Sequence, residues 1–311
     1  MKLAMVFPGQ GSQSVGMVQA YAGSPEVDGV LAEARAALGE DFVRLLDEGP
    51  AEALGQTVNT QPAMVTAGIA AWRAWRAAGG PEPAIVAGHS LGEYTALVAA
   101  GALSLADCLP LVRFRAQCMQ EAVPEGVGGM AAILNLDDDQ VRSACEEASQ
   151  GEVVQAVNFN APGQVVIAGH KTAVARAIEA CKARGAKRAM ALPVSAPFHS
   201  SLMQPAADRL GGYLENVTIG ATRMPLLHNV DVQRNGDATA IRRALVLQAA
   251  SPVRWADTVR AMAAAGVTHV VECGPGKVLA GLVKRIDAGL VGIAVADRAS
   301  LEQALAAVRG G

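Results

Sequence analysis

The sequence predicts an α/β protein in which a large domain with a parallel sheet is interrupted by a smaller inserted domain. Three observations support this prediction. Short apolar runs at residues 3–7 and 84–87 are each followed by a glycine-rich turn, as in strands of α/β sheets. The second turn leads directly into a helical pattern. Between residues 127 and 195 the order becomes β-α-β-β-α-β, which is that of a ferredoxin-like unit.

The composition is that of a globular chain without a basic excess. Of the 311 residues, 51% are hydrophobic and 18% are charged, and the net charge of −3 argues against a nucleic-acid binder. The five cysteines form no C-x-x-C and the five histidines no H-x-x-H, so we expect reduced thiols and no metal site. No signal-peptide or transmembrane pattern occurs, so we expect a cytoplasmic protein without membrane contacts.

A glycine-rich loop at residues 8–13 follows the first predicted strand. Its glycine spacing differs from G-x-G-x-x-G, and no G-K-[ST] is present, so the loop does not predict a nucleotide site. First strands of α/β sheets usually lie centrally, so the loop can offer N–H groups and Gln10 to a site at the sheet edge. Residues 17–80 predict helices, the longest of which is expected to begin at Gln61-Pro62.

Residues 88–92, Gly-His-Ser-Leu-Gly, form a G-x-S-x-G between a predicted strand and a predicted helix. In a nucleophile elbow, such a turn exposes the serine at the carboxyl end of the sheet, and the flanking glycines avoid a clash. The N–H group that follows the serine lies at the helix start, where an oxyanion would form. The alternative is an incidental serine in a glycine-rich turn; the strand–turn–helix context favours Ser90 as a nucleophile.

Residues 105–122 predict a helix that carries an arginine within its apolar stripe. Arg115 falls in this stripe, whereas Arg113 lies about 160° away around the helix. An inward-facing arginine is costly unless an anion meets it. Two interpretations stay open at this point: a structural ion pair or a side chain that extends back to solvent, and a guanidinium that receives a substrate carboxylate.

A glycine-rich hinge at residues 126–129 opens the predicted inserted domain. We expect residues 127–195 to form this domain, and residues 1–126 and 196–311 to form the catalytic domain. The expected strands are at 130–136, 153–160, 165–169 and 188–194, and the expected helices at 138–148 and 171–184.

The chain returns through a loop at residues 195–200 that contains the candidate base, His199. Prolines before and within this loop predict a rigid domain junction, which is a favoured place for a cleft. A lone loop histidine is usually just solvated, but a partner serine in an elbow favours the function of a base. His89 should diverge from Ser90, and His269 lies in a predicted strand. Further strands are expected at 226–230 and 267–273, and helices at 278–286 and 301–308.

The whole chain resembles the malonyl-CoA:acyl-carrier-protein transacylase family. Seven motifs in the same order, spread over nearly the whole chain, carry the resemblance. They occupy residues 7–13, 88–94, 119–122, 158–162, 197–200, 228–230 and 272–276. The resemblance implies a large α/β-hydrolase-like domain, a ferredoxin-like insertion, and an active site in the gorge between them.

The resemblance also implies the catalytic groups. Ser90 matches the nucleophile and His199 the base of this family. The main-chain N–H groups of Gln10 and Leu91 match its oxyanion hole. The family has no triad aspartate; instead a main-chain carbonyl orients the histidine, and Gln248 would supply it here.

The substrate contacts follow from the same resemblance. Arg115 matches the arginine that binds the malonyl carboxylate, which decides between the two interpretations above. Gln61 and Asn160 match polar residues that line the site. Phe198 stands next to the base in the sequence. In related domains, a phenylalanine at the matching position accompanies a preference for malonyl over methylmalonyl. The alternative is that Phe198 only packs within the loop.

We therefore expect malonyl transfer from malonyl-CoA to the phosphopantetheine thiol of acyl carrier protein through a malonyl-Ser90 ester, for fatty-acid synthesis, by a monomer without a cofactor. A polyketide pathway would use the same chemistry. A serine thioesterase and a silent carrier-binding subunit are the rival functions. Acidic carriers could dock on basic residues at 182–188 or at 284–285, although both sets also fit ordinary solvated surface.

Overall fold

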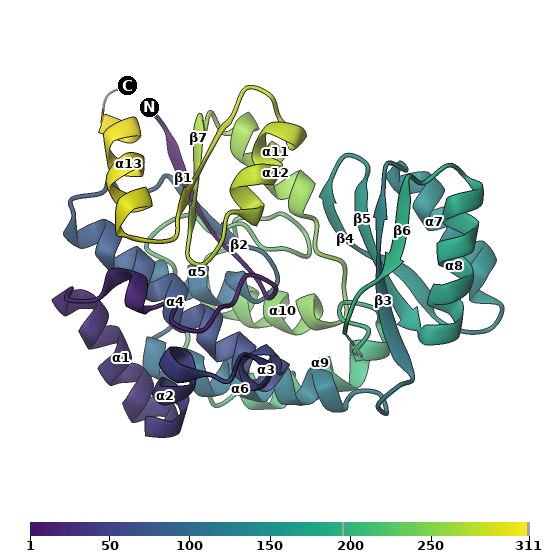
Figure 1. Cartoon of the computed structure of the whole chain (residues 1–311), viewed down its shortest axis with the longest axis horizontal. Helices are drawn as coiled ribbons and strands as arrows, with labels where there is room; N and C mark the ends of the chain where they lie inside the picture. The colour runs from purple at the N-terminus through teal and green to yellow at the C-terminus, as the bar shows by residue number, and fades with distance from the viewer. Residues whose placement is uncertain (195, 310–311) are drawn as a thin grey trace.

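The computed structural model describes residues 1–194 and 196–309 (Figure 1). Its first sheet, sheet A, has the order β2-β1-β7-β8, and every neighbouring pair is parallel. The strands are β1 (Leu3–Phe7), β2 (Ile85–Gly88), β7 (His269–Cys273) and β8 (Val291–Val295). The first strand is central, as expected, so the loop that follows β1 leaves the sheet beside the end of β2.

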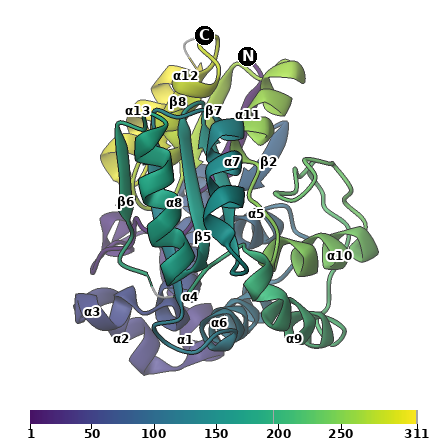
Figure 2. The same cartoon turned by 90° about the vertical axis from the view of Figure 1, so that its right-hand side faces the viewer.

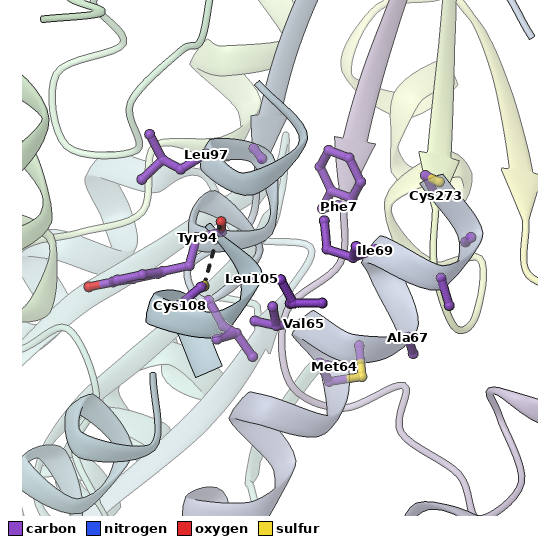
Figure 3. Packing of buried hydrophobic residues seen from close by; sticks show 14 of the residues in the cluster. Phe7, Met64, Val65, Ala67, Ile69, Tyr94, Leu97, Leu105, Cys108 and Cys273 are labelled. Carbon is purple, nitrogen blue, oxygen red and sulfur yellow. Dashed lines mark hydrogen bonds between the residues drawn. The ribbon is translucent and has the colours of Figure 1, made fainter. Parts of the chain in front are cut away.

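Helices cover both faces of sheet A because its central strand is apolar on both sides. Met5 and Phe7 pack into one buried cluster with helices such as α4, and Ala4 and Val6 pack into another with helices such as α11. Figure 3 shows the first cluster around Phe7. The helices are α1 (Pro25–Leu38), α2 (Glu40–Glu48), α3 (Ala51–Gly55), α4 (Thr57–Ala77), α5 (Gly92–Ala99), α6 (Leu105–Glu121), α9 (Gln204–Leu214), α10 (Ala238–Ala249), α11 (Trp255–Ala264), α12 (Val278–Ile286) and α13 (Arg298–Arg309).

The second sheet, sheet B, is antiparallel and has the order β4-β5-β3-β6. Two helices cover one of its faces, as Figure 2 shows, and the element order β-α-β-β-α-β agrees with the prediction. The other face carries Met130, Val157 and Val166, which pack with Phe198 and so face the large domain. The elements are β3 (Gly128–Leu134), α7 (Asp138–Ser149), β4 (Val154–Ala161), β5 (Gln164–His170), α8 (Lys171–Ala183) and β6 (Arg188–Ala191).

Two local predictions were wrong, and one strand was missed. The long helix α4 begins at Thr57, so Pro62 lies inside it and not in its first turn. The expected strand at 226–230 is irregular chain that forms a single bridge, from Leu226 to Val86. Strand β8 was not predicted, although residues 290–296 are apolar on both sides of Gly292, a residue type that strands disfavour. Within the described ranges, no helix combines the length and hydrophobicity needed to span a bilayer.

Candidate active site

The turn between β2 and α5 has the geometry of a nucleophile elbow. Ser90 has φ of 51°, a left-handed conformation that L-residues rarely adopt and that is typical of strained functional turns. A Cβ on Gly88 would lie 1.9 Å from the carbonyl carbon of Gly92, and one on Gly92 would lie 2.1 Å from the main-chain oxygen of Phe7. Both positions therefore require glycine, as the sequence predicted.

His199 lies beside the elbow serine, from which 109 positions separate it in the chain. The two side chains meet at 2.7 Å between Ser90 Oγ and His199 Nε2. The other ring nitrogen, Nδ1, lies 2.9 Å from the main-chain oxygen of Gln248. A carbonyl oxygen can only accept, so Nδ1 carries the proton and Nε2 keeps its lone pair for the serine hydroxyl.

Two main-chain N–H groups at the site have no acceptor among the residues that the structure describes. Neither Gln10 nor Leu91 donates its main-chain N–H to another residue within the described ranges. By contrast, the N–H of Ser90 donates to Asn229 Oδ1 over 2.6 Å. Of the two consecutive N–H groups in the elbow, Leu91 therefore retains the one that can receive an oxyanion.

Arg115 is a buried cation whose hydrogen-bond partners, within the part of the chain that the structure describes, are all neutral. Its side chain in α6 is 1% exposed. Nη1 donates to Gln61 Oε1 over 2.7 Å, and Nη2 donates to Gln248 Oε1 over 2.9 Å and to Ser90 Oγ over 3.2 Å. Burial lowers the pKa of Arg115. A buried guanidinium that has no carboxylate partner among the described residues, and that lies next to a serine hydroxyl, can receive an anion.

Arg113, two positions earlier, has a different environment. Its guanidinium lies over the ring of Phe42 at 5.3 Å from the centroid and is only partly buried. The predicted difference between the two arginines of this helix is therefore confirmed.

A buried network of polar side chains, which the sequence reasoning missed, is hydrogen-bonded to the main chain of the elbow. Glu93 is fully buried; Oε1 lies 2.7 Å from His228 Nδ1, and Oε2 accepts from Gln248 Nε2 over 2.7 Å. Asn229 donates its main-chain N–H to Glu93 and its side-chain Nδ2 to the oxygen of Gly88. Burial alone would lower the pKa of His228, but the hydrogen bond and charge of Glu93 raise it. The motif at residues 228–230 was part of the resemblance, but no role had been inferred for it.

The serine opens into a cavity of about 370 Å³ between the two sheets. Sheet A and its helices contribute Gln10, Gln61 and Arg115, and the inserted segment contributes Met130 and Asn158 on its inner face. Other lining residues include Ser90, Leu91, Met119, Phe198 and His199.

Asn160 does not line this cavity. Its Oδ1 lies 2.8 Å from His89 Nε2, so it holds the histidine next to the elbow serine. Asn158 lines the cavity instead, and its buried Oδ1 has no hydrogen-bond partner among the described residues. Irregular register of β4 between residues 156 and 161 decides which asparagine faces inward, and no local sequence signal indicates this irregularity.

A larger cavity of about 890 Å³ lies between α7, β4 and α11 and contains none of the predicted site residues. Of the two basic clusters, the one near the end of α8 is partly neutralised, because Lys182 pairs with Glu179 and Arg184 with Glu147. Arg285 donates to Gln164. In the part of the chain that the structure describes, no three His, Cys, Asp or Glu side chains gather as a metal site would require.

Comparison with known proteins gives concordant results. A model of the acyl transferase domain matches residues 4–295. The malonyl CoA-acyl carrier protein transacylase of Salmonella typhimurium is 56% identical over 305 residues, which cover 98% of this chain and 99% of that protein. The corresponding protein of Escherichia coli K12 is 55% identical over 305 residues, with the same coverage of both chains.

Solved structures agree with these relatives. An acyl-carrier-protein S-malonyltransferase from Burkholderia pseudomallei 1710b is 62% identical and matches with a TM-score of 0.96, covering 98% of this chain and 99% of that chain. A malonyl-transacylase in complex with its type II PKS acyl-carrier protein is 51% identical, with a TM-score of 0.96 and the same coverage.

The fold and the family match define the class of the protein, which is an acyl transferase. The match extends over almost the full length of relatives that share more than half of its residues. Within that class, the chain belongs to the malonyl CoA-acyl carrier protein transacylase family.

Proposed function

We propose that this protein transfers a malonyl group from malonyl-CoA to the phosphopantetheine thiol of acyl carrier protein, for fatty-acid synthesis, through a malonyl ester of Ser90. The observation that carries the proposal is Arg115, a buried cation that pairs with no carboxylate of residues 1–194 and 196–309 and lies 3.2 Å from Ser90 Oγ. A malonyl group on the serine would bring a carboxylate to that cation. A simple acyl group would leave the guanidinium without an anion.

In the first half-reaction, His199 Nε2 removes the proton of Ser90 as Oγ attacks the thioester carbonyl carbon. The main-chain N–H groups of Gln10 and Leu91 hold the resulting oxyanion; each such donor is worth ~3 kcal/mol. The tetrahedral intermediate then collapses. The carbon–sulfur bond breaks, His199 returns the proton to the sulfur of CoA, and malonyl-Ser90 remains.

The second half-reaction runs the same steps in reverse. His199 takes the proton of the phosphopantetheine thiol, whose sulfur attacks the ester carbon. The bond to Ser90 Oγ then breaks, and His199 gives the proton that it took from the thiol to Oγ. The main-chain oxygen of Gln248 fixes the tautomer of His199 in both directions, which replaces the aspartate of a Ser-His-Asp triad. Two successive transfers through one ester imply ping-pong kinetics.

The proposed chemistry uses only side chains and main-chain N–H groups, so the enzyme would need no cofactor. Malonyl-CoA and acyl carrier protein are its substrates, and we infer a cytoplasmic monomer without nucleic-acid or membrane partners. We assign residues 1–126 and 196–311 to the catalytic domain and 127–195 to the inserted domain, since sheets A and B separate in this way. The boundary residue Ser195 lies outside the described residues.

Phe198 and Asn160 are assigned to the substrate site with different support. Phe198 lines the cavity next to the base, which supports a role in selecting malonyl over larger acyl groups. Asn160 would act through His89, to which it is hydrogen-bonded, and not by touching the substrate. Gln61 contacts Arg115 directly and helps to orient the guanidinium.

The direct test is mass spectrometry of the intact protein after it is mixed with malonyl-CoA. We expect a single malonyl adduct, located on Ser90 by peptide mapping, because the first half-reaction needs no carrier. Addition of phosphopantetheinylated carrier should remove the adduct and label the carrier. A folded protein that forms no adduct would identify a silent carrier-binding subunit. Rapid hydrolysis of malonyl-CoA without carrier would identify a thioesterase.

The rate of Ser90 acylation should not depend on pH between about 8 and 5, because His199 remains a neutral base throughout. Burial, and next the charge of Arg115, lower the pKa of His199 to about 3. The second-order rate constant for malonyl-CoA, measured by rapid quench, tests this. Circular dichroism at each pH controls for unfolding. A decline centred at about pH 6.5, where an ordinary histidine titrates, would contradict it.

A further inference from the structure

Gln10 belongs to a loop that has little internal support. The loop follows β1 and contains Gly11 with φ of 118°, and the main-chain N–H of Gly11 donates to the side chain of Gln13. The side chain of Gln10 is exposed, although its main-chain N–H is needed at a defined place in the proposed mechanism. Something outside the loop must therefore restrict the conformation of this residue.

Thr57 supplies this restraint from a helix. It is the first residue of α4 and is buried, and its Oγ1 lies 2.9 Å from Gln10 Oε1. The hydrogen bond joins residues 47 positions apart and ties the loop to a helix of 21 residues that packs in the core. Sequence reasoning did not select Thr57, because its contact with the loop is long-range.

The direction of this hydrogen bond follows from its neighbours. Arg115 Nη1 can only donate, so Gln61 turns Oε1 toward it. The amide nitrogen of Gln61 then faces Thr57 and donates to Oγ1 over 3.3 Å. Thr57 Oγ1, as an acceptor on that side, has its single proton free for Gln10 Oε1. A series of hydrogen bonds with a fixed direction thus connects Arg115, through Gln61 and Thr57, to Gln10.

We propose that Thr57 is a positioning residue that fixes the main chain of Gln10, so that the Gln10 N–H points at the oxyanion. The proposal rests on the function proposed above. It deepens that function by assigning the geometry of the oxyanion hole to a hydroxyl that does not touch the substrate. Because Thr57 shares its hydroxyl with Gln61, the oxyanion hole and the arginine site form one hydrogen-bonded unit.

The test is Thr57→Val, which keeps the shape of the side chain and removes the hydroxyl. The first-order rate constant of Ser90 acylation at saturating malonyl-CoA should fall about tenfold to hundredfold, since a displaced donor fails in the transition state. The half-saturating concentration should change by less than about threefold. Thr57→Ser, which keeps the hydroxyl, should act within about threefold of the wild type.

Thr66→Val is the matched control, since Thr66 is buried on the same helix and donates to the oxygen of Pro62. It should leave the acylation constant unchanged. Equal constants for Thr57→Val and the wild type, or no recovery in Thr57→Ser, would overturn the proposal. A wild-type protein that forms no malonyl adduct would instead overturn the proposed function.

A second variant covers the case in which Thr57→Val does not fold. Gln10→Met removes the acceptor of the same hydrogen bond but keeps the main-chain N–H. Because the side chain of Gln10 is exposed, we expect this variant to fold. Gln10→Met should lower the acylation rate constant by a similar factor. If Thr57→Val folds, the double variant that combines both substitutions should be no slower than either single variant, because both remove the same hydrogen bond. A wild-type rate in Gln10→Met would overturn the proposal.

Discussion

Replacing Ser90 with alanine should lower malonyl transfer to acyl carrier protein by about 10⁴-fold or more, because no ester can form on the enzyme. The variant removes only the hydroxyl group. In the wild type, this hydroxyl is hydrogen-bonded to His199 Nε2 over 2.7 Å, and the proton leaves along this hydrogen bond. Steady-state transfer and intact-protein mass spectrometry measure the loss of rate and the loss of the adduct.

The same variant should still bind malonyl-CoA. Arg115 and Gln61 keep their mutual hydrogen bond without the serine, so the carboxylate site remains. Isothermal titration calorimetry should therefore give a dissociation constant for malonyl-CoA within about tenfold of the wild-type value. A Ser90→Ala protein that transfers malonyl at the wild-type rate would eliminate the ester mechanism.

The parts of the fold that could be predicted are those that local patterns determine. The elbow was predicted correctly because Gly88 and Gly92 have no room for a side chain, and the turn leaves a signature of fixed spacing. The inserted domain was predicted from its element order, because each strand and helix has its own apolar periodicity. Strand β8 escaped prediction although its residues are apolar, because Gly292 interrupts the run and strands disfavour glycine.

The site was less predictable because contacts between distant segments build it. His199 was a candidate partner of Ser90 from its loop alone, but the resemblance was needed to choose it, since no local pattern links residues that are 109 positions apart. Thr57 and Asn229 were missed for the same reason, although Thr57 donates to the side chain of Gln10 and Asn229 accepts from the main-chain N–H of Ser90. The position of Arg115 on its helix left two interpretations open, and only the structure shows that it is buried among neutral hydrogen-bond partners, which favours the carboxylate site.

Replacing Arg115 with alanine should have the second largest effect, and the effect should depend on the acyl group. Loss of a bidentate, charge-assisted contact with a carboxylate removes ~4 kcal/mol, or about 10³-fold in malonyl acylation of Ser90. Acetyl acylation should change by less than about tenfold, since acetyl has no carboxylate to lose. Rapid-quench measurement with malonyl-CoA and acetyl-CoA gives both constants.

Two variants on the same helix separate this effect from general damage. Arg113→Ala removes an arginine that lies over Phe42, outside the cavity, and should leave both constants unchanged. Arg115→Lys keeps the charge without the planar fork, so malonyl acylation should fall less than in Arg115→Ala. Equal losses for malonyl and acetyl in Arg115→Ala would mean that the arginine supports the pocket without recognising the carboxylate. A selective loss would mean that the buried charge itself defines which acyl group Ser90 accepts.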